Sequence, residues 1–100
     1  MNITSEGNTL QVAGLAELNA ANAGAFRDQV RAAIQPQHSF VVLDFSQTRF
    51  VDSSGLGALI SIHKSICGRG GMVRILNPIP SVQQILELTR MHRIFEVTRS

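Results

Sequence analysis

The sequence has 100 residues, of which 44% are hydrophobic and 16% are charged. This is enough apolar material for one modest core and too little chain for two, so we predict a single domain over residues 1–100. The formal net charge is +2, but the basic residues are scattered along the chain without forming a cluster, which argues against direct binding of nucleic acid.

The N-terminal segment predicts a hairpin at one edge of a sheet. Ile3, Leu10 and Val12 alternate weakly with polar residues, and the turn-forming residues 6–8 lie between them. Residues 20–34 then show apolar positions three and four apart, which predicts an amphipathic helix that ends before Pro36.

Residues 40–43 form an unbroken apolar run, which predicts a strand at the sheet centre that is covered on both faces. A second helix is predicted from about Ser53 to Cys67, with Cys67 on its inner side, and the glycine-rich residues 68–71 stop it. A strand over residues 72–76 follows.

Pro80 suits the first turn of a third helix that reaches about Thr89, and residues 93–97 alternate as a last strand. The order strand, strand, helix, strand, helix, strand, helix, strand implies right-handed crossovers. We therefore predict an α/β fold, with a mixed, mostly parallel sheet of about five strands and helices packed against it.

A short polar cluster, Asp52-Ser53-Ser54-Gly55, separates an apolar strand from an apolar helix. Asp52 or Ser53 can serve simply as the helix N-cap, worth about 1 kcal/mol. The same position equally suits a phosphoserine, because free N–H groups and the positive end of the helix dipole meet there. Spacing alone leaves both interpretations open.

Small residues recur along the predicted second helix at Ser54, Ala58, Ser61 and Ser65, which are spaced four, three and four residues apart. Such a stripe lets another protein approach closely. Plain solvent exposure explains the pattern as well.

Several kinds of chemistry lack support in the sequence. The histidines His38, His63 and His92 have no diagnostic spacing to the serines, and the serine run lacks the first glycine of G-x-S-x-G, so we predict no enzyme. His63 falls on the inner helix face and is interpreted as a core histidine. No metal-ligand pattern or phosphate-binding glycine loop occurs, so no metal or cofactor is assigned.

Localisation follows from three absences. Cys67 is the only cysteine, the N-terminus lacks the features of a signal peptide, and no run of about 18 apolar residues occurs. We therefore predict a cytoplasmic protein without membrane insertion.

The run of residues 50–57, Phe-Val-Asp-Ser-Ser-Gly-Leu-Gly, resembles the STAS domain of bacterial anti-sigma factor antagonists. The resemblance extends through residues 42–45, 70–73 and 80–82, so it covers nearly the whole chain. It implies that Ser53 is phosphorylated by a partner that is both anti-sigma factor and serine kinase. It also implies that the unphosphorylated form binds this partner and frees a sigma factor, and that a PP2C-type phosphatase reverses the modification.

Matched by position, Asp52 and Gly55 would shape the loop, and Leu18-Asn19 falls where the family often has Leu-Asp. Asn19 thus removes one negative charge from the expected docking surface. The partner-binding residues that we predict are Asn19, Asp52, Ser54, Gly55, Ala58 and Ser61.

Family members commonly carry another helix after the last strand, so the resemblance implies that one surface of residues 1–100 is exposed. The same fold also suits a binding subunit that does not switch, for instance in a lipid-transport ATPase complex or a signalling assembly, in which the serine is only a cap. Whether the domain forms a homodimer stays open.

Overall fold

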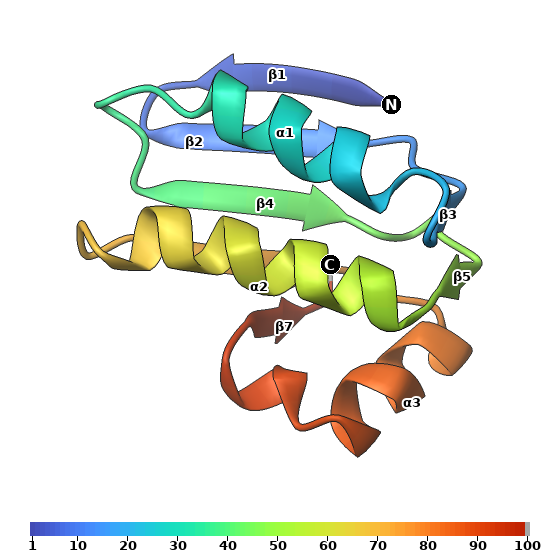
Figure 1. Cartoon of the computed structure of the whole chain (residues 1–100). Coiled ribbons are helices and arrows are strands. Elements are labelled where there is room, and N and C mark those ends of the chain that lie inside the picture. The colour runs from blue at the N-terminus through green and yellow to red at the C-terminus, as the bar shows by residue number, and fades with distance from the viewer. Residues whose placement is uncertain (100) are drawn as a thin grey trace.

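The computed structural model describes residues 1–99. The elements in chain order are β1 (Asn2–Glu6), β2 (Thr9–Ala13), β3 (Glu17–Leu18), α1 (Ala23–Ala33), β4 (Phe40–Asp44), β5 (Phe50–Val51), α2 (Ser53–Cys67), β6 (Met72–Leu76), α3 (Pro80–Leu88), the 3-10 helix η1 (Met91–Arg93) and β7 (Glu96–Thr98) (Figure 1).

The main sheet has five strands in the order β1-β2-β4-β6-β7. Only β1 and β2 pair antiparallel, as a hairpin, whereas all the other neighbours are parallel. The predicted α/β class, the mixed and mostly parallel sheet and the central position of β4 are therefore confirmed.

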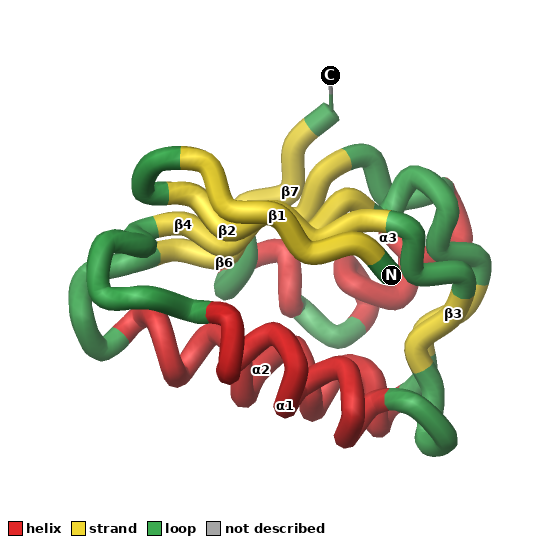
Figure 2. Tube along the Cα trace, turned by 90° about the horizontal axis from the view of Figure 1, so that it is seen from above, coloured by secondary structure: helices red, strands yellow, loops and turns green. Residues whose placement is uncertain are grey.

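All three α-helices lie on one face of this sheet, and the other face is uncovered (Figure 2). Val41 and Leu43 of β4 point to the helices and are fully buried, whereas Phe40 and Val42 on the opposite face are only half-buried. The prediction that β4 is covered on both faces is wrong. Phe40 and Val42 are apolar although they lie on the uncovered face. The sequence of β4 therefore lacks the alternation of apolar and polar residues that a strand covered on one face normally shows.

The C-terminal part begins its strand later than predicted. Arg90 adopts a left-handed conformation with φ of 61°, and the amide of Phe95 donates to the carbonyl of Met91 at 2.9 Å. These local bonds form η1 and delay β7, whose predicted bounds of 93–97 become Glu96–Thr98. The start of the predicted strand therefore lies in η1 and in the turn that follows it, and not in β7.

A second sheet of only two strands positions the site. β3 pairs parallel with β5, so that Leu18 lies opposite Val51. The buried hydroxyl of Thr48 donates to the carbonyl of Leu15 at 2.6 Å and joins the same two segments. The loop that precedes α1 is consequently held beside the start of α2.

The core fills the space between the main sheet and the helices. α1 and α2 pack side by side over the sheet (Figure 1), and Phe26, Val30 and Leu59 belong to one buried cluster. Cys67, predicted on the inner side of α2, is exposed instead. It follows Ile66 in the last helical turn, and Ile66 takes the buried position there.

Candidate functional site

Asp52 is the N-cap of α2. Its backbone is extended, with φ of −107° and ψ of −173°, and its Oδ1 accepts a hydrogen bond from the amide of Gly55 at 3.0 Å. Of the two capping candidates, the structure selects Asp52, because its carboxylate satisfies one of the unpaired amides of the first turn. Ser53 is therefore the first helical residue.

The second carboxylate oxygen of Asp52 binds a different segment. Oδ2 accepts from the amide of Ala20 at 3.1 Å, and the Asp52 amide donates to the carbonyl of Leu18 at 3.1 Å. One aspartate thus fastens the loop between β3 and α1 to the start of α2. We call this arrangement the Asp52 junction.

Asn19 lies inside the loop that Asp52 holds. Its side-chain Oδ1 accepts a hydrogen bond from the backbone amide of Ala21 at 3.0 Å, and its backbone amide donates to the side-chain Oδ1 of Asn22 at 2.8 Å. These short-range bonds fold the loop before α1 begins. The structure therefore brings Asn19 next to the serine turn, where the resemblance predicted it.

Gly55 permits the close approach of α2 to β3. A Cβ at this position would lie 2.7 Å from the carbonyl oxygen and 2.8 Å from Cγ of Leu18. Gly55 is buried, so its role within the domain is packing, and its predicted part in partner binding stays a prediction. Its place in the motif has a packing reason, since only glycine fits against the Leu18 backbone.

Ser53 and Ser54 are both exposed. Neither hydroxyl forms a hydrogen bond within residues 1–99, and their two amides are unpaired donors of the first helical turn. The fold therefore leaves the hydroxyl of Ser53 available for a reaction, with N–H groups close by that suit an anion.

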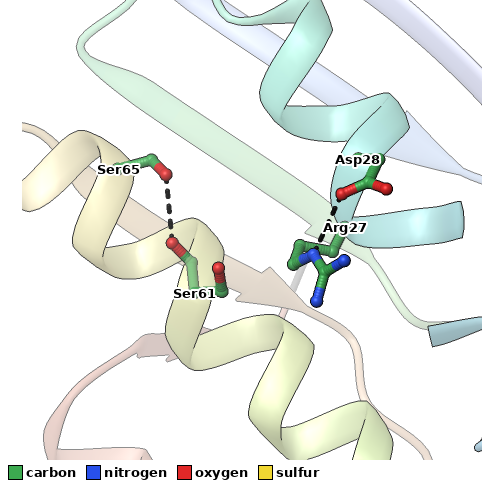
Figure 3. A network of polar contacts seen from close by, with 4 residues as sticks. All are labelled: Arg27, Asp28, Ser61 and Ser65. Atoms are coloured by element: carbon green, nitrogen blue, oxygen red, sulfur yellow. Dashed lines mark hydrogen bonds and ion pairs between the residues drawn. The ribbon is translucent and has the colours of Figure 1, made fainter. Parts of the chain in front are cut away.

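The predicted small-residue stripe divides between core and surface. Ala58 is 3% exposed and belongs to the core cluster, so it faces the interior, and its predicted part in partner binding stays a prediction. Ser61 and Ser65 are half-buried, and the Ser65 hydroxyl donates to the carbonyl of Ser61 at 3.1 Å (Figure 3).

On the neighbouring α1, Arg27 forms an ion pair with Asp28, with 3.0 Å between Nε and Oδ1 (Figure 3).

The exposed ridge of α2 contains Ser53, Gly57 and Lys64 instead. A Cβ added at Gly57 would have nothing within 4 Å, so packing inside the domain does not require a glycine there. Sequence reasoning missed this position. The signal was available, because 53, 57 and 64 follow the helical repeat from the predicted phosphorylation site.

A large apolar side chain lies close to the turn. Phe50 of β5 is 49% exposed, and it pairs across the small sheet with Glu17. The sequence alone marks Phe50 only as part of the motif. Exposed aromatic side chains are frequent anchors in protein interfaces, so Phe50 adds apolar area to the surface around Ser53.

None of the three histidines hydrogen-bonds to Ser53 or Ser54 within residues 1–99. His38 is 1% exposed, and its Nδ1 accepts from the amide of Gln35 at 2.8 Å, which assigns the proton to Nε2. Nε2 then donates to the hydroxyl of Ser5 at 2.7 Å. Because Nε2 of His38 carries the proton, it cannot accept a proton from the Ser5 hydroxyl. The contact between His38 and Ser5 is therefore structural, and His38 is not placed there as a general base.

His63 packs edge-on against Phe95, with ring centroids 5.7 Å apart. Its Nδ1 is buried and has no hydrogen-bond partner within residues 1–99, so it differs from the satisfied core histidine that was expected. Nδ1 of His92 lies 3.5 Å from the carbonyl of Leu86. Neither residue forms a bond to the serine turn.

Residues 1–99 contain no group of three or more His, Cys, Asp or Glu side chains that could hold a metal ion. None of the helices in that range is long and apolar enough to span a membrane.

Comparison with known proteins places the serine turn in a family. The family model described as STAS domain matches residues 1–100. A Thermotoga maritima protein, provisionally described as an anti-sigma factor antagonist, is 32% identical over 82 residues, 81% of this chain and 73% of that protein. An anti-sigma F factor antagonist from Paenibacillus polymyxa is 30% identical over 82 residues, 81% of this chain and 70% of that protein.

Solved structures agree with this family. The crystal structure of the Thermotoga protein has a TM-score of 0.89 and 26% identity, covering 99% of this chain and 85% of that one. The anti-sigma factor antagonist SpoIIAA in its unphosphorylated form has a TM-score of 0.86, covering 99% and 86% of the two chains. At 20% identity, this second likeness supports the fold alone.

Proposed function

Because the chain belongs to the STAS domain family, we propose that it is a phosphorylation-controlled regulatory protein of the anti-sigma factor antagonist type. In its unphosphorylated form it binds an anti-sigma factor that is also a serine kinase, and this binding releases a sigma factor. Phosphorylation of Ser53 ends the binding, and a PP2C-type phosphatase restores it. The family match and the names of the similar proteins support this proposal.

The observation that carries the proposal is the separation of roles between Asp52 and Ser53. Asp52 caps α2 and fastens the neighbouring loop, whereas Ser53 is exposed and its hydroxyl is not used by the fold. In the proposed reaction the Ser53 oxygen attacks the γ-phosphorus of ATP, ADP leaves, and the hydroxyl proton passes to a base of the kinase. This domain supplies the acceptor and no catalytic group.

The effect of the phosphate falls mainly on the partner. Within the domain, the added charge of about −1.5 to −2 lies beside the carboxylate of Asp52, and the helix dipole returns about 0.3–1 kcal/mol. At a docked interface, the same charge must be desolvated or placed near like charge, which costs several kcal/mol. Phosphorylation therefore acts as an interface switch and leaves the fold intact.

The docking surface that we propose combines exposed and half-buried residues around the switch. It includes Asn19, Asp52, Ser54 and Ser61 from the sequence prediction, and it adds Phe50, Gly57 and Lys64 from the structure. Gly55 and Ala58 support this surface from below.

The test uses the anti-sigma kinase that co-purifies with the wild-type chain. Incubation with this kinase and ATP should add one phosphate to wild type and none to Ser53→Ala, as read by intact-protein mass spectrometry. Ser53→Asp should also lose binding to the kinase, whereas Ser53→Ala should keep it.

Ser54→Ala and Ser54→Asp are the matched controls, because Ser54 is equally exposed and one residue away. Labelling that persists in Ser53→Ala and disappears in Ser54→Ala would move the switch to Ser54. A partner that binds Ser53→Asp as tightly as wild type would instead favour the alternative of a subunit that does not switch.

A further inference from the structure

The uncovered face of the main sheet contains a hollow of about 630 Å³. Its lining residues on β4, Phe40 and Val42, belong to the sheet face that the helices do not cover, and none of the lining residues belongs to the Asp52 junction. Its lining comes from the β1–β2 turn and four neighbouring strands: Asn8, Thr9, Gln11, Phe40, Val42, Arg74, Leu76, Glu96 and Thr98. The hollow therefore has an apolar floor from β4 and β6 and polar groups at its sides.

Arg74 is already oriented in this hollow. Its Nε donates to Oε1 of Glu96 at 3.1 Å, and its Cζ lies 5.7 Å from the ring centroid of Phe40. With Nε engaged, the two Nη groups form no hydrogen bond within residues 1–99. That free edge of a guanidinium matches the two oxygens of a carboxylate, and the Glu96 bond fixes its direction.

Thr98 forms part of the wall of the hollow. Its register opposite Leu76 places it on the same face, and it lines the hollow. Its Oγ1 is covered by neighbouring atoms and has no hydrogen-bond partner within residues 1–99. The polar contact available to a ligand in the hollow is therefore the guanidinium of Arg74.

From this geometry we propose that the open sheet face binds a small amphipathic carboxylate, such as a medium-chain fatty acid. The carboxylate accepts from the free edge of Arg74, and the hydrocarbon part lies over Val42 and Leu76. Arg74 provides the only positive charge of the lining, and its unpaired Nη groups beside these apolar side chains match a ligand that has one anionic end and an alkyl chain.

The test is an amide NMR titration of the whole chain with octanoate, with octan-1-ol and octylamine as matched ligands of equal chain length. Octanoate should shift the amides of β4, β6 and β7, and the alcohol should bind about tenfold more weakly because it loses the charged pair. Arg74→Gln should weaken octanoate binding by about tenfold, because the charged hydrogen bonds are lost.

Arg31→Gln is the matched control, since it removes an exposed arginine from α1 on the opposite side of the sheet and should leave octanoate binding unchanged. Equal affinity for octan-1-ol, tighter binding of octylamine, or shifts confined to the helices would overturn the proposal. A further result would also overturn it. If sedimentation equilibrium shows a dimer that Val42→Asp dissociates, and octanoate does not bind, then a second copy of the chain occupies this face.

Discussion

The Asp52 junction and the surroundings of His38 use the same device at opposite ends of the sheet. Asp52 joins the β3–α1 loop to α2 with its two carboxylate oxygens, whereas the two ring nitrogens of His38 join the α1–β4 loop to β1. Near His38, Arg69 adds a further bond to the carbonyl of Gln35 at 3.0 Å. At each end, one side chain thus forms two hydrogen bonds that join separate segments, and further bonds add to them.

The two ends differ in whether polar groups without hydrogen bonds remain beside the contact. His38 is 1% exposed, and both of its nitrogens are used. The Asp52 junction instead borders exposed serines with unused hydroxyls and amides. At His38, both ring nitrogens are hydrogen-bonded and the ring is buried, so the contact serves only to hold the fold. At the Asp52 junction, exposed polar groups without a hydrogen bond lie beside the contact, so they remain available to a partner.

The largest effect should come from His38→Ala. It removes a buried ring and leaves the amide of Gln35 unpaired, so the free energy of unfolding should fall by about 3 kcal/mol. Urea denaturation measures the loss. Phosphorylation of Ser53 in the variant should proceed as in wild type below its melting temperature, and reduced labelling of folded protein would show that the two ends are coupled.

Gly55→Ala should destabilise by about 2 kcal/mol, since its Cβ would press on the Leu18 backbone and force α2 away from β3. Unlike His38→Ala, it should also reduce labelling of Ser53, because the shift displaces the turn itself. Thermal unfolding and the phosphorylation assay measure the two effects. A variant with lower stability and normal labelling would mean that the kinase does not read the geometry of the junction.

Asp52→Ala should cost about 1 kcal/mol through loss of the N-cap, and it also leaves the amide of Ala20 without its acceptor. Ser53→Ala is the matched neighbour and should change stability by less than about 0.5 kcal/mol, as surface substitutions usually do. Chemical denaturation of both variants compares them directly. Equal losses would contradict the assignment of the cap to Asp52.

Gly57→Ala should give the smallest change in stability and the opposite sign. Replacing an exposed helical glycine by alanine should raise the free energy of unfolding by about 0.5–1 kcal/mol. If a partner covers this ridge of α2, the same variant should bind it more weakly because of the added methyl group. Stabilisation with unchanged affinity would remove Gly57 from the docking surface.

Sequence reasoning located the elements with strong end signals well. The predicted bounds of α2, about 53–67, and of β6, 72–76, agree with the structure, because a polar capping run, a glycine-rich stop and a short apolar run mark them. β3 and β5 were missed, because strands of two residues have no periodicity to detect. Their pairing is what brings Asn19 to Asp52, so the composition of the site could not follow from periodicity alone.

The partner surface was predicted in part for a similar reason. Spacing placed Ala58 in a stripe with Ser54 and Ser61, but a helix turns by about 100° per residue, so small residues can fall on either side of the buried edge. Burial decides between them, and it depends on where α1 packs. Gly57 became visible only once the structure showed that no internal contact requires it.

The division of roles between Asp52 and Ser53 has a consequence for how such domains diverge. Since the cap, the loop contact and the close packing depend on Asp52 and Gly55, the residue at position 53 carries no structural duty. Under the proposed function, a lineage could exchange serine there for alanine and acquire a permanently active regulator, or for aspartate and acquire a permanently silent one, without a compensating change elsewhere in the fold.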